Sequence, residues 1–153
     1  MFKKLVNKKR LNNEKGLTLI ELLAVIVILA IIAAIAIPAI GNIINKSKDR
    51  AILAEASNIL AGAKIAYADG VCDGDKKACN QTTLKDFVEG IKLPDGTLVT
   101  YSETNKVWTI AYPRFLELKL KEFKIDGSIT ENDLNKKLTK AGGSEEGSEG
   151  GSN

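Results

Sequence analysis

Hydrophobic residues are concentrated in one stretch near the start of the chain. From Leu17 to Ile40 only Thr18 and Glu21 are strongly polar, whereas residues 1–15 are polar and basic and the sequence after Ile40 is mixed. At 1.5 Å per residue, a helix of this length spans about 36 Å, which exceeds the roughly 30 Å hydrocarbon core of a bilayer. The pattern therefore predicts that this stretch is a membrane-spanning helix.

A second helical pattern follows the apolar stretch. Between Asn42 and Ala68, apolar residues recur at alternating spacings of three and four, the period of a helix with one buried face. This stripe consists of Leu53, Ala56, Leu60, Ala63 and Tyr67. Charged residues lie mainly off the stripe, namely Lys46, Lys48, Asp49, Arg50 and Glu55. We predict one long helix over residues 17–68, with its second half packed on another layer.

Pro38 and Gly41 lie between the two halves of the predicted helix. Proline removes one backbone hydrogen bond and crowds the preceding turn, so it bends or loosens a helix. We expect a bend at these residues, which lets the apolar half adapt to different surroundings.

The sequence after the helix predicts a small antiparallel sheet. Gly70 ends the helix, and segments rich in β-branched and aromatic residues or in alternating polarity then follow. These predicted strands are residues 97–101, 106–112 and 116–121, and Ser102 to Asn105 form a turn between the first two. We expect the sheet to pack against the helix, in an α+β fold.

Two spacings typical of capping boxes predict short helices in the same region. They are Thr83-x-x-Asp86 and Thr130-x-x-Asp133, and the second follows a turn at Asp126-Gly127. We expect the first helix to stop near Gly90 and the second near Lys140. The head then spans residues 69–140, and the Gly, Ser and Glu composition of residues 141–153 predicts a disordered tail.

The composition argues against an enzyme. The chain has no histidine, which is the usual general base and the commonest metal ligand. Asp73 and Asp75 supply two carboxylates, fewer than the six to eight oxygens that calcium takes. We expect no catalytic residue, no metal site and no cofactor.

The positive charge of the chain belongs to its first residues. The net charge is +3, but residues 1–16 hold six Lys/Arg and one Glu, which leaves 16 basic and 18 acidic residues for the remainder. A basic segment before a membrane helix stays in the cytoplasm, so we expect the head outside the membrane. Residues 69–140 hold 12 residues of each sign, which gives no support to nucleic-acid binding.

The junction Lys15-Gly16-Leu17-Thr18-Leu19-Ile20-Glu21 resembles the class III signal of type IV prepilins, in which Gly precedes an apolar run with Glu at its fifth position. Pro38, the twenty-second residue counted from Leu17, also matches that family. Two departures are Leu17, where the family usually has Phe, and the long leader, residues 1–16. The resemblance implies a pilin fold, cleavage after Gly16 and N-methylation of Leu17, in a system of the Gram-positive type.

The spacing of this motif also has a physical rationale. A carboxylate within an apolar helix is costly, about 2.5 to 3.5 kcal/mol if it lies deep, so Glu21 needs a cationic partner. Cleavage after Gly16 creates an amine on Leu17 that is mostly protonated at neutral pH, because such amines have a pKa of about 7.7 to 8.0. We expect this amine to meet Glu21 of a neighbouring subunit and to set the register of assembly.

The resemblance implies a structural protein, a subunit of an extracellular pilus filament that is a membrane protein before assembly. The implied partners are other copies of the chain and other pilins, a prepilin peptidase that cleaves and methylates, a membrane platform protein and, indirectly, an assembly ATPase. A pseudopilin of a secretion or competence system is an alternative with the same chemistry. A membrane-tethered binding domain, a plain anchor and a secretory signal ending at Ala34-Ile35-Ala36 are further alternatives.

Two features of the predicted head concern its stability. Cys72 and Cys79 lie in a loop outside the membrane, where an even number of cysteines favours a disulfide, with free thiols as the alternative. Trp108 lies in a predicted strand, and we expect it to pack against Tyr67 or the apolar stripe of the helix rather than to bind a ligand.

Overall fold

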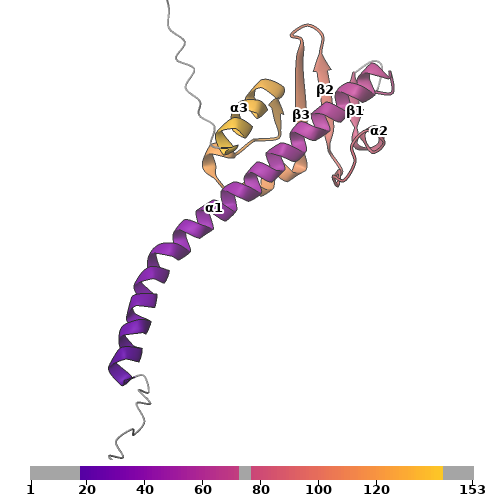
Figure 1. Ribbon diagram of the computed structural model, residues 1–153. Coiled ribbons are helices and arrows are strands. Elements are labelled where there is room, and N and C mark those ends of the chain that lie inside the picture. Colours follow the sequence, from indigo (N-terminus) through magenta and orange to yellow (C-terminus); the bar gives the residue numbers. More distant parts are fainter. Residues whose placement is uncertain (1–17, 73–76, 143–153) are drawn as a thin grey trace, which may run out of the picture. The chain divides into compact units, whose positions relative to one another are not determined.

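The computed structural model describes residues 18–72 and 77–142 (Figure 1). Its elements in chain order are α1 Leu19–Ala68, β1 Ala78–Asn80, α2 Gln81–Leu84, β2 Leu98–Ser102, β3 Val107–Ala111, the 3₁₀ helices η1 Pro113–Glu117 and η2 Lys121–Phe123, β4 Ser128–Thr130 and α3 Glu131–Gly142. A long first helix followed by a small antiparallel sheet confirms the predicted α+β pilin-like architecture.

The chain divides after Ile40 into two compact units, and helix α1 contributes to both. The described part of the first unit is the apolar start of α1, in which the large side chains are exposed, from Leu19 at 84% to Ile40 at 53%. By length and composition, α1 can cross a membrane, and no part of its most apolar stretch is buried. This unit therefore presents apolar surface that needs another environment to cover it.

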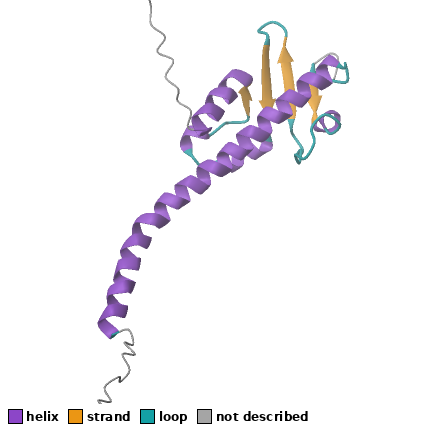
Figure 2. Cartoon of the chain, viewed as in Figure 1, coloured by secondary structure: helices purple, strands orange, loops and turns teal. Residues whose placement is uncertain are grey.

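The second unit contains a four-stranded sheet in the order β1-β2-β3-β4, antiparallel throughout (Figure 2). Because side chains alternate along a strand, one face of the sheet carries Val99, Ile110 and Ile129, which are all buried. Register pairs Val99 with Ile110 and Ile110 with Ile129, so these side chains form one row across the sheet. They belong to the same core as buried residues of α1.

Helix α1 supplies the other half of that core. The predicted stripe is confirmed for Leu53, Ala56, Leu60 and Ala63, which are fully buried or nearly so, and Tyr67 packs partly buried at its end. The ring of Trp108 meets that of Tyr67 edge-on, with centroids 5.4 Å apart, which agrees with the predicted packing. Gly70 then adopts a φ of 71°, and the amide of the following Val71 donates to the carbonyl of Ala66, which ends the helix.

The predicted third strand is wrong. Residues 116–121 lie in η1, a connecting loop and the start of η2, and no strand includes them. The leucines alternate in burial because Leu118 points into the core while Leu116 is 80% exposed. Pro113 opens η1 and lacks the N–H that a strand would donate, so the alternation reflects turns rather than a pleated strand.

The helix caps in the head also differ in part from the prediction. Asn80 caps α2, because its Oδ1 accepts the amides of Thr82 and Thr83, and α2 ends at Leu84, so the expected helix from Thr83 to Gly90 is wrong. The Thr130-x-x-Asp133 box is confirmed, since the amide of Asp133 donates to Oγ1 of Thr130 at 3.3 Å.

Helix α3 extends two residues beyond the predicted Lys140. Ala141 and Gly142, which the sequence placed in the tail, belong to α3, where Ala141 is buried, and residues 143–153 lie outside the described residues. An apolar side chain at the end of an amphipathic helix continues its buried face, which a change in composition alone did not indicate.

Close packing at Gly62 gives a first testable prediction. A Cβ on Gly62 would lie 2.5 Å from Cγ2 of Val88 and 2.7 Å from the carbonyl oxygen of Phe87, whereas a Cβ on Gly41 would meet nothing within 4 Å. We expect Gly62→Ala to lower the free energy of unfolding by about 1 to 3 kcal/mol through overpacking. Gly41→Ala should instead be neutral or stabilising by up to about 1 kcal/mol, because alanine favours helix.

Thermal unfolding of both variants in detergent would measure the difference. The two substitutions make the same chemical change in the same helix, so helix propensity alone would shift both melting temperatures in the same direction. Equal shifts would contradict the packing argument.

Candidate functional site

The predicted processing residues lie at the border of the described chain. Gly16 and Leu17 are outside it, and Thr18 is its first residue. The cleavage and methylation predictions at Gly16 and Leu17 therefore remain predictions. Glu21, in the first turn of α1, is the one predicted assembly residue of this motif that the structure describes.

Thr18 and Glu21 form a capping box that the sequence analysis missed. The backbone amide of Thr18 donates to Oε2 of Glu21 at 2.8 Å, its hydroxyl donates to the same oxygen at 2.9 Å, and the amide of Glu21 donates to Oγ1 of Thr18 at 3.2 Å. The signal was available, because Thr18-x-x-Glu21 has the Ser/Thr-x-x-Glu/Gln spacing of this motif.

The capping box holds the Glu21 carboxylate against the amino-terminal end of α1. The amides of a first helical turn lack intrahelical acceptors, and the helix dipole favours negative charge there. The carboxylate is thus oriented toward the end of the helix at which cleavage after Gly16 would create an amine. Glu21 is fixed in position before any partner binds.

Pro38 and Gly41 lie within α1, which is helical from Leu19 to Ala68. Both residues are exposed. The predicted bend falls at the border between the two units of the chain and remains a prediction.

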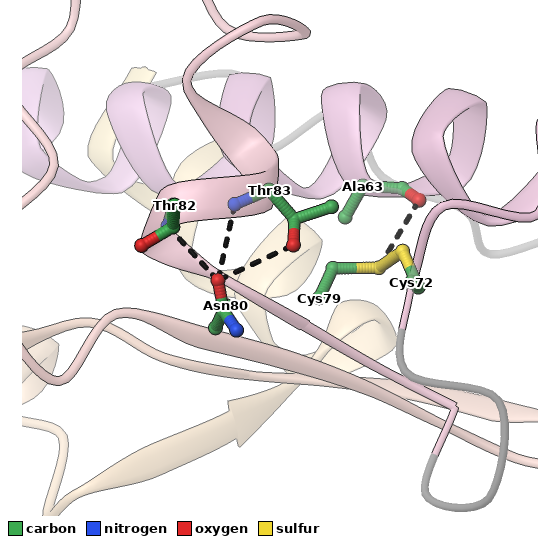
Figure 3. Close-up of a disulfide and its surroundings, with 6 residues drawn as sticks. All are labelled: Ala63, Cys72, Cys79, Asn80, Thr82 and Thr83. Atoms are coloured by element: carbon green, nitrogen blue, oxygen red, sulfur yellow. Dashed lines mark hydrogen bonds between the residues drawn. A yellow bond between two sulfur atoms is a disulfide. The ribbon is translucent and has the colours of Figure 1, made fainter.

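Cys72 and Cys79 form a disulfide, with their Cα atoms 4.7 Å apart (Figure 3). Sγ of Cys79 lies 3.6 Å from the carbonyl oxygen of Ala63, so the bridge sits against α1. Cys79 is fully buried in β1, and the register of the sheet pairs it with Val99 of β2. The disulfide therefore fixes the end of the helix to β1.

Asp49 is a buried carboxylate that the sequence analysis misplaced on the exposed side of α1. Its two oxygens accept the amide of Lys119 at 2.9 and 3.1 Å, and Oδ2 also accepts the amide of Leu120 at 2.8 Å. The side chain is fully buried, so these bonds replace its lost hydration. The sequence carries no signal for this contact, which joins residues about 70 positions apart.

A second polar group joins α1 to η1. The hydroxyl of Tyr112 donates to Glu55 at 2.8 Å, Arg114 forms an ion pair with Glu55, and Arg114 also pairs with Glu117 at 3.1 Å. Burial, together with the hydrogen bond that its hydroxyl donates to the Glu55 carboxylate, raises the pKa of Tyr112 to about 12. The hydrogen bond from Arg114 lowers the pKa of the Glu117 carboxyl. Tyr112 therefore stays protonated, and Arg114 and Glu117 stay charged, across the neutral range.

Within residues 18–72 and 77–142, no group of three or more His, Cys, Asp or Glu side chains is placed to hold a metal ion. Asp73 and Asp75 lie outside the described residues.

A family model described as the prokaryotic N-terminal methylation motif matches residues 11–37. The match covers the end of the leader, Gly16, Leu17, Glu21 and most of the apolar helix, and it does not reach the head. No curated protein and no solved structure matches the chain significantly. Residues 11–37 thus carry the class III signal peptide of type IV pilins, and with an α+β pilin-like architecture behind it the chain fits a type IV pilin or pseudopilin precursor.

Proposed function

We propose that this chain is the structural subunit of an extracellular type IV pilus filament. It is made as a membrane-anchored precursor, cleaved after Gly16, N-methylated on Leu17 and polymerised through the apolar half of α1. The observation that carries the proposal is the methylation motif over residues 11–37, followed directly by a helix whose large apolar side chains are exposed.

The exposed apolar surface supports polymerisation after membrane insertion. Apolar area removed from water contributes about 25 cal/mol per Å², so helices that leave the bilayer are stable only when they cover one another. A head-to-tail contact that does not close into a ring produces a filament. The same segment then serves first as the membrane anchor and later as the filament core.

The capping box at Thr18 and Glu21 supports a defined register. It holds the Glu21 carboxylate at the amino-terminal end of α1, four residues after Leu17 in the sequence, so the cationic amine of one subunit can approach Glu21 of a staggered neighbour. A charge pair inside an apolar bundle disfavours any register that leaves either charge alone, because an unpaired buried charge is strongly destabilising.

Processing is the most direct test of this function. We expect the protein isolated from its cells to have a mass that corresponds to an amino terminus at Leu17 with one added methyl group. Intact-mass measurement and sequencing of the amino-terminal peptide check this. An uncleaved chain, or one cleaved after Ala36, would reject the pilin function in favour of an ordinary anchor or secretory signal.

The partners follow from this processing and remain part of the proposal. They are a peptidase that cleaves and methylates, a membrane platform protein, an assembly ATPase that acts indirectly, and further copies of the chain. The mature protein is then a surface filament with the head outside the membrane. Electron microscopy of filament length separates this function from that of a pseudopilin, which shares the chemistry and forms a shorter product.

A further inference from the structure

Basic residues are frequent in two segments of the head unit that the contacts of Asp49 join. Three come from the first turns of α1 after Gly41, and three come from the segment around η2. Together they form what we call the basic surface: Lys46, Lys48, Arg50, Lys119, Lys121 and Lys124. All of them are exposed except Lys46, which is half-buried.

Hydrogen bonds of the Asp49 side chain bring these two segments together. The buried Asp49 accepts the amides of Lys119 and Leu120, so the backbone before η2 is fixed to α1 between Lys48 and Arg50. Lys48 and Lys119 also line one open hollow. The basic surface is therefore a built arrangement rather than two unrelated runs in the sequence.

Three acidic residues of these segments are already occupied, and a fourth, Asp126, lines a separate hollow with Lys124. Asp49 is bound to backbone amides, Glu117 pairs with Arg114, and Glu122 pairs with Lys140. Among the residues that the structure describes, none of the six side chains of the basic surface forms an ion pair with an acid. Lys119 lies near enough to Glu117 to help lower the pKa of that carboxyl, so the positive charge left for a partner outside the head comes mainly from the other five side chains.

An apolar side chain lies within the same surface. Leu116 is 80% exposed and lines the same hollow as Lys48 and Lys119. An exposed apolar residue beside lysines is the combination that binds at a lipid headgroup boundary, where the apolar group enters and the cations meet phosphate. Nucleic-acid phosphate would leave Leu116 unexplained.

The covalent chain keeps one member of this surface, Lys46, near the apolar segment. Lys46 follows Ile40 by six residues, so it lies within roughly 20 Å of the end of the apolar segment even if the chain between them were fully extended. Along a helix, the rise from Ile40 to Lys46 is about 9 Å, which is comparable with the Debye length of about 8 Å at physiological salt.

We propose that the basic surface docks the head on the phosphate headgroups of anionic lipids, in the membrane that anchors the precursor. The proposal rests on the membrane-anchored precursor and not on polymerisation. Attraction of clustered Lys and Arg to an anionic leaflet is additive in charge and weakened by salt. Docking would hold a subunit against the bilayer until it is extracted into a filament.

Lysine labelling of the full chain in lipid nanodiscs tests this surface. The probe is an amine-reactive reagent, read by mass spectrometry, in discs of zwitterionic lipid with and without phosphatidylglycerol. The four test lysines are Lys48, Lys119, Lys121 and Lys124, and the internal controls are Lys85, Lys92 and Lys106, which are equally exposed and lie elsewhere on the head. We expect anionic lipid to slow labelling of the test lysines by about threefold or more, and about 0.5 M salt to remove the effect.

A matched pair of variants checks the origin of the protection. Lys119→Gln, Lys121→Gln and Lys124→Gln together should bring the labelling rate of Lys48 in anionic discs to within about twofold of its rate in neutral discs. The control triple, Lys85→Gln, Lys92→Gln and Lys106→Gln, should leave the protection of Lys48 unchanged.

Several results would overturn the proposal. One is equal labelling of test and control lysines in both kinds of disc. Another is faster labelling of the test lysines in neutral discs after removal of residues 143–153. That result would mean that the glutamates of this segment, rather than lipid, are the partner of the basic surface. Protection by added duplex DNA but not by anionic lipid would assign it to a nucleic acid. A chain that does not co-purify with lipid would contradict the anchored precursor itself, and this outcome is distinct from unprotected lysines in a chain that does.

Discussion

Replacing Glu21 with alanine should leave cleavage after Gly16 intact and reduce filament formation at least about tenfold, a change that corresponds to about 1.4 kcal/mol. In the proposed function, cleavage takes place at the junction before the helix, whereas the Glu21 carboxylate would be needed only when the helices leave the lipid. A charge pair at about 4 Å contributes roughly 4 kcal/mol at an effective dielectric constant of 20, from which the desolvation of both groups is subtracted. Without the carboxylate, the new amine of Leu17 has no partner inside the bundle.

The measurement is the ratio of filament to membrane-bound subunit, after confirmation of processing by intact mass. Thr18→Val is the matched control, because it removes the hydroxyl from the capping box and leaves the carboxylate in place. We expect this control to assemble to within about threefold of the unchanged protein, since loss of a cap costs only about 0.5 to 2 kcal/mol.

Two results would count against the pairing argument. Normal filaments from the Glu21→Ala chain would show that the carboxylate is not required. An equal defect in Thr18→Val would instead assign the effect of both changes to a loosened start of the helix.

The parts of this fold that could be predicted from sequence are those in which one strong signal acts over many residues. The apolar run and the stripe from Leu53 to Tyr67 each repeat one pattern over several turns, so the long helix and its buried face were predicted correctly. The hairpin of β2 and β3 was also predicted, because β-branched and aromatic residues flank a compact turn. In each case burial and local preference favour the same structure.

The parts that failed depend on contacts between distant residues. Strands β1 and β4 have three residues each, too few to show a period, and they exist because β2 and β3 pair with them. Alternation at Leu116 and Leu118 indicated a strand, but the segment is held by bonds from its amides to Asp49 and forms turns. The candidate site divides in the same way, because Glu21 follows from a motif whereas the basic surface depends on the fold.

The Asp49 contact predicts the largest effect on the stability of the head. Asp49→Ala removes the acceptor of two backbone amides, on Lys119 and Leu120, in a place where water does not replace it. An unsatisfied buried donor costs about 1 to 3 kcal/mol, so we expect a loss of roughly 2 to 5 kcal/mol in the free energy of unfolding. Because folded domains are stable by only about 5 to 15 kcal/mol, this is a large fraction of the total.

Thermal unfolding of the full chain in detergent should show this loss as a fall of about 10 °C or more in melting temperature. Lys48→Ala, a change at the neighbouring exposed residue, should alter stability by no more than about 0.5 kcal/mol. Hydrogen exchange supplies a local readout, because the amides of Lys119 and Leu120 should exchange faster in Asp49→Ala than other amides of the head do. Asp49→Asn should be intermediate, since its single carbonyl oxygen can take the place of Oδ2, which accepts both amides. A melting temperature unchanged by Asp49→Ala, with both amides still protected, would mean that the segment is held to α1 by its apolar contacts alone.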